Sequence, residues 1–477
     1  MNNKYFISVL FFTLTLFTLS WSQDIDYSAK ITRYAGKASK NAVDAVMIVQ
    51  GYEWGPGVPK VIVEFSDAVS GFDKSTFLVN SGASNRVILD AYNTDIKGIK
   101  QASPTNYVTF EFRVKNGEAN PFNYDSKKYL NIWADPYELK LSLAKNKAFT
   151  IGETEFNDAN PFSFQMNLAG KYIIPETVGW KKDSYTNGEY TLQRGYFTPK
   201  DAETDGGKNP LIIWLHGAGE GGNDIDIVLL GNEVVALSRD EIQKYFTTDD
   251  IKGAYVLVLQ TPTMWMDRGD GQYNDKTPAG QKQKSCYDAV LFAAIQDYVK
   301  SNPDIDSNRI YVGGCSNGGY MTMNLMFEHG DFFTAYYPIC EAYFNKHISD
   351  EMIEQVKDYN VWFIASEDDT TVDPLSTSIP TFYRFLKAGS KEVHYTLYDH
   401  VKGTDDPNAN YIGHFSWVYA FNDQVNKEFD NNKVIEDLPN FAFDQDTGAI
   451  TTPNKYVTNA NCNKSGNMWA WMASKTK

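Results

Sequence analysis

The sequence lacks a basic cluster, an internal repeat and, after its first 20 residues, a long apolar run. Its 477 residues carry a net charge of -16 and a pI of about 4.9, and no basic cluster offsets the acidic residues. This balance argues against nucleic acid or an anionic membrane surface as a partner. No internal repeat is evident, and no apolar run after the first 20 residues is long enough for a membrane span.

Cysteine is scarce as well. The spacing of the four cysteines fits no zinc-binding pattern, and a chain of this length does not depend on disulfides for stability. Two of them follow adjacent predicted strands, where they could pair or remain buried free thiols. The four are Cys286, Cys315, Cys340 and Cys462.

Residues 1–22 are predicted to be a signal peptide. Lys4 gives a positive start, residues 5–19 are largely apolar, and Ser20 and Ser22 have the spacing that a signal peptidase reads. The apolar run is shorter than the ~20 residues of a membrane span. We therefore expect cleavage after Ser22 and a secreted protein, either extracellular or periplasmic.

Two patterns divide the rest of the chain. Residues 24–167 contain short extended runs separated by Gly, Pro, Asn and Asp, which predicts a β-sandwich. Residues 169–477 alternate continuous apolar runs with helix-spaced stretches, which predicts an α/β domain whose mostly parallel sheet is covered by helices on both faces. The expected strands of this domain are 189–198, 211–215, 255–260, 310–313, 335–339, 361–365 and 393–398, and the expected helices are 281–301, 376–387 and 467–472.

The central motif lies in residues 309–319. A short apolar run is followed by Gly314, Cys315, Ser316, Asn317 and Gly318, and then by a helix-spaced stretch. A Gly-Xaa-Ser-Xaa-Gly turn between strand and helix holds its serine on a strained backbone and lifts the hydroxyl above the sheet. Ser316 is therefore the predicted nucleophile; the alternative is a helix-capping serine in a glycine-rich turn.

A glycine-rich loop follows the strand at 211–215. An acyl-transfer intermediate develops negative charge on oxygen and needs fixed N–H donors. We predict that the backbone amides of Ala218 and Asn317 form this oxyanion hole. The alternatives are an ordinary turn or a phosphate cradle, although no phosphate-binding loop motif is present.

Several carboxylates follow the strand at 361–365, where an acid could orient a histidine. Asp369 is favoured over Asp368 and Asp373. A solvated acidic loop is the alternative for the remaining residues.

Three histidines occur late in the chain. His394 lies inside a predicted strand, where a structural role is expected. His414 is favoured as the general base because Gly413 gives the backbone of its loop the conformational freedom to bring the imidazole near Ser316 Oγ. His400 is the alternative. The order Ser316, Asp369, His414 is that of the α/β-hydrolase fold.

Residues 313–321, 215–219 and 413–417 resemble secreted esterases of the α/β-hydrolase superfamily, known as prolyl-oligopeptidase-like or polyhydroxybutyrate-depolymerase-like. The resemblance covers roughly residues 190–421, and some of these esterases carry an N-terminal immunoglobulin-like domain. It implies a serine carboxylic-ester hydrolase that needs no metal or organic cofactor. The resemblance identifies no acyl group; our first hypothesis for the substrates is ester substituents of polysaccharides, or polyesters.

Further residues are candidates for substrate binding: Trp265, Glu341 and Tyr343, each just after a predicted strand. Trp265 could equally be a packing residue. Two other functions stay open. One is a serine peptidase on the same scaffold, although the N-terminal part shows no propeller repeat; the other is a non-catalytic adhesion or carbohydrate-binding protein.

Overall fold

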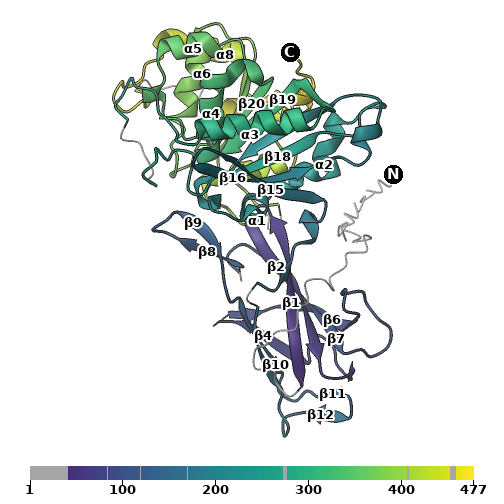
Figure 1. Ribbon diagram of the computed structural model, residues 1–477. Coiled ribbons are helices and arrows are strands. Elements are labelled where there is room, and N and C mark those ends of the chain that lie inside the picture. The colour runs from purple at the N-terminus through teal and green to yellow at the C-terminus, as the bar shows by residue number, and fades with distance from the viewer. Residues whose placement is uncertain are drawn as a thin grey trace, which may run out of the picture.

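The computed structural model describes residues 41–82, 84–118, 120–168, 170–271, 277–404, 408–451 and 458–477. The predicted signal peptide lies outside these residues. Figure 1 shows a β-rich N-terminal domain below an α/β domain, and the ends of strands β1 (Ala42–Tyr52) and β2 (Gly55–Phe65) reach the junction near helix α1 (Ile225–Gly231).

The N-terminal domain is the predicted β-sandwich, and it is immunoglobulin-like. One sheet has the order β14-β1-β2-β7-β6 and the other the order β13-β10-β4-β5. Val49, Val63 and Leu141 lie in the core between them. The remaining strands of the two sheets are β4 (Phe77–Ser81), β5 (Ser84–Arg86), β6 (Ile88–Thr94), β7 (Tyr107–Phe112), β10 (Glu138–Leu143), β13 (Ser163–Asn167) and β14 (Tyr172–Ile173).

Smaller sheets flank the sandwich. Strand β14 pairs in parallel with β1, so the sheet continues past residue 167, where the sandwich was predicted to end. The hairpin β8-β9 lies at the junction with the second domain in Figure 1. The smaller strands are β3 (Val69–Ser70), β8 (Phe122–Asp125), β9 (Leu130–Trp133), β11 (Phe149–Ile151) and β12 (Thr154–Phe156).

Among the described residues, the C-terminal domain is built on an eight-stranded sheet with the order β15-β16-β18-β17-β19-β20-β21-β22. The strands from β18 to β22 run parallel, and the hairpin β15-β16 adds an antiparallel edge. This is the predicted α/β-hydrolase fold. Its strands are β15 (Trp180–Asn187), β16 (Tyr190–Phe197), β17 (Asn209–Leu215), β18 (Tyr255–Gln260), β19 (Ile305–Cys315), β20 (Ala335–Ile339), β21 (Asn360–Ser366) and β22 (Val393–Tyr398).

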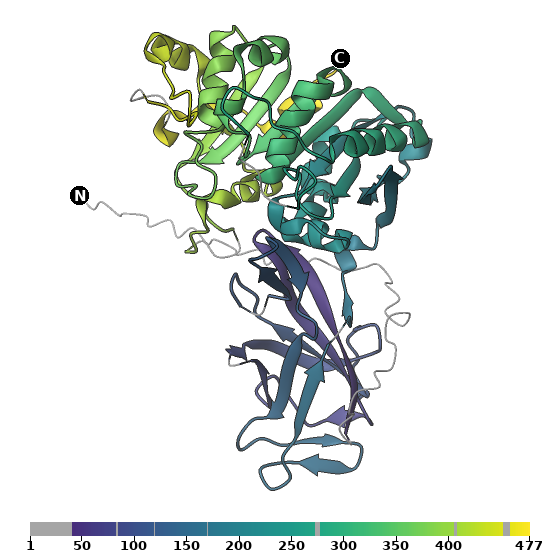
Figure 2. The ribbon, with the colours of Figure 1, turned by 60° about the vertical axis from the view of Figure 1, so that its left-hand side comes forward.

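Helices cover both faces of this sheet (Figure 2). In β17, Leu211 and Ile213 enter one core while Ile212 and Trp214 enter the other. Burial on both faces explains why these strands are apolar without alternation. The further helices are α2 (Asp240–Gln243), α3 (Asp288–Ser301), α4 (Asn317–His329), α5 (Asp350–Val356), α6 (Ser378–Lys387), α7 (Trp417–Phe421), α8 (Asn431–Asp437) and α9 (Met468–Ala473), and β23 (Lys427–Glu428) pairs with β24 (Lys464–Ser465).

The helix predicted at 281–301 was placed too early. It begins at Asp288, because the preceding residues bond away from the helix axis: the Cys286 amide donates to the Asp267 carbonyl, and the Tyr287 amide donates to Ser285 Oγ. Among the described residues, no helix has both the length and the apolar content needed to cross a bilayer.

Candidate active site

Ser316 occupies a sharp turn between β19 and α4. Its backbone has φ 56° and ψ −115°, a conformation that non-glycine residues rarely adopt. The turn closes only because its neighbours lack side chains: a Cβ on Gly318 would lie 1.9 Å from the Leu215 carbonyl oxygen, and one on Gly314 would lie 2.4 Å from it. The predicted strand, turn and helix are therefore present, and Ser316 lines a pocket above the sheet.

The glycine-rich loop after β17 forms a short helical turn, η4 (Ala218–Glu220), beside Ser316. In the described part of the chain, the backbone amides of Ala218 and Asn317 donate no hydrogen bond. Asn317 is also the first residue of α4, where the helix dipole favours negative charge. Both amides thus remain available to an oxyanion.

His216, which the sequence analysis did not single out, fixes the start of this loop. Its Nδ1 bonds the Gly217 carbonyl at 2.5 Å, and its Nε2 accepts from the Thr261 amide at 3.1 Å. Burial lowers the pKa of His216 to about 4, so the ring is neutral and can fill both roles. Its position directly after a buried strand was the available signal.

The structure brings His414 and Asp369 together. His414 lies in η9 (Gly413–Phe415), and its Nδ1 is 2.8 Å from Asp369 Oδ2. The other carboxylate oxygen of Asp369 accepts from the amides of Thr371 and Val372, both at 2.9 Å. These bonds hold the carboxylate in the orientation that the imidazole requires.

The competing residues lie elsewhere. Asp368 accepts from Ser366 Oγ at 2.6 Å, and Asp373 caps a turn through the Leu375 amide. His400 pairs with its neighbour Asp399 instead of entering the pocket.

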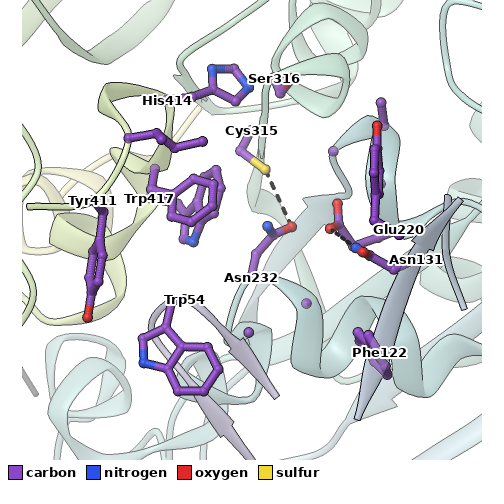
Figure 3. A pocket seen from close by; sticks show the side chains of 18 of the residues that line it. Trp54, Phe122, Asn131, Glu220, Asn232, Cys315, Ser316, Tyr411, His414 and Trp417 are labelled. Carbon is purple, nitrogen blue, oxygen red and sulfur yellow. Dashed lines mark hydrogen bonds between the residues drawn. The ribbon is translucent and has the colours of Figure 1, made fainter. Parts of the chain in front are cut away.

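The electrostatics around His414 favour its charged form. Burial opposes the charge, but the sulfur of Cys340 and the carboxylate of Asp369 outweigh it and raise the pKa of His414 to about 10. Figure 3 shows the imidazole beside Ser316. In the described chain Ser316 Oγ makes no hydrogen bond, an open arrangement that is common before a substrate binds.

The pocket has a volume of about 620 Å³ and lies between the two domains. The N-terminal domain supplies Trp54, Phe122 and Asn131, while the hydrolase domain supplies the rest of the labelled residues in Figure 3. Aromatic rings form much of its wall: Trp54, Phe122, Tyr124, Tyr411, Phe415 and Trp417. Five amide side chains are among its polar groups: Asn116, Asn120, Asn131, Asn232 and Asn410.

One carboxyl group lies in this pocket. Glu220, in the η4 turn, accepts from Asn131 Nδ2 at 3.2 Å. Burial raises the pKa of Glu220 to about 7, against the weaker opposing effect of nearby donors and His414. The described lining residues include no Lys or Arg, so apart from His414 they offer no cationic side chain to an anionic ligand.

The structure does not place the three predicted substrate-binding residues in this pocket. Trp265, Glu341 and Tyr343 are at most 1 % exposed. Trp265 Nε1 donates to the His216 carbonyl at 3.0 Å, so this side chain supports the glycine-rich loop from beneath. Such burial does not support direct contact between these residues and a substrate at this site.

All four cysteines are free thiols in the structure. Cys315 and Cys340, which were left open as a pair, are both buried, and Cys315 Sγ donates to Asn232 Oδ1 at 3.4 Å. Among the residues described, no group of three or more His, Cys, Asp or Glu side chains is arranged to hold a metal ion.

Two family models match the chain. Residues 44–153 match the esterase Ig-like N-terminal domain, and residues 267–429 match the prolyl oligopeptidase family. No protein of curated function matches the sequence.

The chain is similar to solved structures, and the first of those that follow shares its fold. The crystal structure of a thermostable esterase is 22 % identical with a TM-score of 0.61, covering 83 % of this chain and 98 % of its own. A ferulic acid esterase is 14 % identical with a TM-score of 0.37, covering 51 % of this chain and 93 % of its own. An acylaminoacyl peptidase in complex with a chloromethyl ketone is 14 % identical with a TM-score of 0.36, covering 79 % of this chain and 56 % of its own.

The two family matches divide along the chain as the two domains do, and the esterase structure covers both domains. The chain therefore joins an immunoglobulin-like domain, similar to the N-terminal domain of esterases over residues 44–153, to a serine-hydrolase domain of α/β-hydrolase fold that is similar to the prolyl oligopeptidase family over residues 267–429.

Proposed function

We propose that the protein is a secreted carboxylic-ester hydrolase that works through an acyl-enzyme on Ser316, with His414 as general base and Asp369 as its orienting acid. One observation carries the proposal: a serine on a strained turn and a histidine held by a buried aspartate line the same pocket. This combination is what nucleophilic acyl transfer requires.

The steps follow from the geometry. Neutral His414 takes the proton of Ser316 Oγ through Nε2, and the oxygen attacks the ester carbonyl carbon. The amides of Ala218 and Asn317 hold the resulting oxyanion, and the departing alcohol receives the proton from His414. Water then gives a proton to His414 while its oxygen attacks the acyl carbon; the bond from that carbon to Ser316 Oγ breaks, the acid leaves, and His414 returns the proton to Ser316 Oγ.

The lining of the pocket supports a neutral, hydroxyl-rich alcohol such as a sugar unit of an acylated polysaccharide. Aromatic rings can stack on the C–H faces of a sugar ring, and amide side chains can bond its hydroxyl groups in fixed directions. The absence of Lys and Arg among the described lining residues argues against uronates and phosphates. An aromatic or aliphatic polyester would use the rings, but its backbone has no donor for the amide oxygens, and leaving these unpaired costs binding energy.

The first experiment compares the purified chain with its Ser316→Ala variant on p-nitrophenyl acetate, p-nitrophenyl butyrate and methyl ferulate. We expect turnover that disappears in the variant. Equal background rates for both proteins would reject the ester hydrolase, and a non-catalytic binding protein would then be the better reading.

The second experiment tests the substrate class. Trp54→Ala should raise KM for an acetylated neutral oligosaccharide and leave KM for ethyl acetate unchanged, because only the sugar reaches the Trp54 ring. Equal changes for both esters, or for neither, would contradict a sugar-binding role of this wall.

A serine peptidase is the second candidate, because residues 267–429 match the prolyl oligopeptidase family. Peptidyl p-nitroanilides test it with the same pair of proteins. Turnover of these amides faster than of the esters would reverse the order of the two candidates.

Export is also proposed, from the pattern of residues 1–22. Expression with the full N-terminus in a bacterium that secretes proteins, followed by mass spectrometry of the product, should find Gln23 as the first residue. An intact Met1 on intracellular protein would contradict export.

A further inference from the structure

A carboxylate of the immunoglobulin-like domain is buried against the loop that carries His414. Glu53 and Trp54 form the two-residue turn between β1 and β2, where Tyr52 pairs with Gly55. The turn projects out of the sandwich into the hydrolase domain (Figure 1). Glu53 is 4 % exposed, so its charge depends on hydrogen bonds from the other domain.

These bonds come from both sides of His414. On the N-terminal side, Glu53 accepts from the Thr404 amide at 2.6 Å, from Thr404 Oγ1 at 2.5 Å and from the Tyr411 hydroxyl at 2.9 Å. On the C-terminal side, it accepts from Asn422 Nδ2 at 2.7 Å, and its backbone carbonyl accepts from Trp417 Nε1 at 3.1 Å. One residue therefore ties together a segment that extends eight to ten residues to either side of the imidazole.

The fit of this contact is close. A Cβ on Gly403 would lie 2.9 Å from Glu53 Oε1 and 2.4 Å from the Tyr411 hydroxyl. The loop can thus approach the carboxylate only because position 403 has no side chain. The described donors are all neutral, so the charge in each bond comes from the Glu53 carboxylate, which strengthens the bond. Without an opposite charge nearby, these bonds depend mainly on their geometry.

We propose that Glu53 is a positioning residue for His414: the immunoglobulin-like domain holds the histidine loop so that the imidazole stays between Asp369 and Ser316. This inference rests on the proposed function, because it gives His414 the role of general base. It goes beyond that function, because it makes the N-terminal domain a working part of the active site and not only a neighbour of it.

The test uses Glu53→Ala and Glu53→Gln in the full chain. Loss of the carboxylate should let the histidine loop shift, and a displacement of about 1 Å at a catalytic group can cost roughly 100-fold in rate. We expect kcat on p-nitrophenyl acetate to fall about 10- to 100-fold in Glu53→Ala with KM changed much less. Glu53→Gln keeps one acceptor oxygen and should fall less.

Glu176→Gln is the matched control. Glu176 is another largely buried interdomain carboxylate, accepting from the Gly51 amide at 2.7 Å and from Arg239 at 2.6 Å, but it does not bond the histidine loop. Its substitution should lower thermal stability to a similar degree as the Glu53 variants. It should leave kcat and the pH dependence of kcat unchanged.

A second readout does not depend on turnover. Hydrogen exchange followed by mass spectrometry should show faster exchange of residues 408–422 in Glu53→Ala, and not in Glu176→Gln, at a temperature where both variants are folded. Unchanged exchange in this segment would overturn the positioning role whatever the activity. Unchanged kcat in a Glu53→Ala protein whose loop exchanges faster would overturn it too.

The two proposals fail in different ways. If Ser316→Ala retained the activity of the unmodified protein, the ester-hydrolase function would be rejected while the exchange result still judged the loop. If Ser316→Ala were inactive and Glu53→Ala fully active, only the inference about Glu53 would be rejected.

Discussion

Replacing Asp369 by Asn tests the charge behind His414 without changing the size of the side chain. Asp369 Oδ2 lies 2.8 Å from His414 Nδ1, and Oδ1 accepts two backbone amides. The NH2 group of Asn must face either His414 Nδ1 or those two amides, so it either meets buried donors or shifts the imidazole proton to Nε2, where it blocks proton transfer from Ser316. The lost charged bond is worth about 1.5–3 kcal/mol and the unpaired donor about 1–3 kcal/mol.

These terms add to about 3–6 kcal/mol of lost transition-state stabilisation, which corresponds to a fall of roughly 10²- to 10⁴-fold in kcat/KM. The pH dependence should change as well. His414 must be neutral to accept the Ser316 proton, so the rate rises with pH up to the raised pKa near 10. Removing the Asp369 charge lowers this pKa, and the acidic limb of the profile should move to lower pH.

The assay is a pH–rate profile on p-nitrophenyl acetate, with Asp368→Asn as the matched control. Asp368 bonds only Ser366 among its described side-chain contacts, and Asn can accept that bond, so the control should stay within about threefold of the unmodified rate. A larger loss in Asp368→Asn than in Asp369→Asn would refute the assignment. So would an Asp369→Asn protein that keeps a third or more of its activity.

Two further substitutions test the electrostatics of the pocket. Cys340→Ala removes a sulfur that helps raise the pKa of His414 against burial, so the acidic limb should move to lower pH with little loss at the alkaline plateau; an unmoved limb would contradict this. Burial raises the pKa of Glu220 to about 7, so its contribution to stability is full below pH 4.5 and is lost as the pH rises through 7. Glu220→Gln cannot ionise, and its free energy of unfolding in urea should therefore depend less on pH between 5 and 8, by up to about 3 kcal/mol; equal pH dependence of the two proteins would count against a buried neutral carboxyl.

The parts of the site that sequence could predict are those that follow from local rules. The Ser316 turn needs residues without a side chain where the Leu215 carbonyl approaches, and the sequence shows Gly314 and Gly318 at these positions. The strands were recognisable because both faces of the sheet are buried, which leaves continuous apolar runs. The hydrolase fold and its order of elements follow from these two signals.

The choice between neighbouring aspartates depends on three-dimensional packing. Asp368 Oδ1 accepts from Ser366 Oγ at 2.6 Å and lies against Gly413, where a Cβ would be 2.2 Å from it, so this carboxylate is held outside the bond to His414. Asp369 then faces His414. The sequence analysis favoured Asp369, but sequence position alone separates the two residues poorly, since each follows the same strand by a few residues.

The burial of the three residues predicted to bind substrate could not be foreseen from the sequence, for a different reason. Trp265, Glu341 and Tyr343 follow strand ends, but all three are at most 1 % exposed, and aromatic composition does not distinguish a pocket wall from a core. The residues that do line the pocket include Trp54 and Asn131, which precede Ser316 by more than 180 positions. No local pattern connects them to the catalytic domain.

The contacts between the domains explain why that connection matters. The N-terminal domain reaches both loops beside Ser316: Asn131 bonds Glu220 in the glycine-rich loop, and Glu53 bonds the histidine loop. Ile227 and Leu230 of α1 also lie in the core of the sandwich. Separating the domains would expose this apolar surface and leave the Glu53 carboxylate without its donors, so the immunoglobulin-like domain and the active site form one cooperative unit.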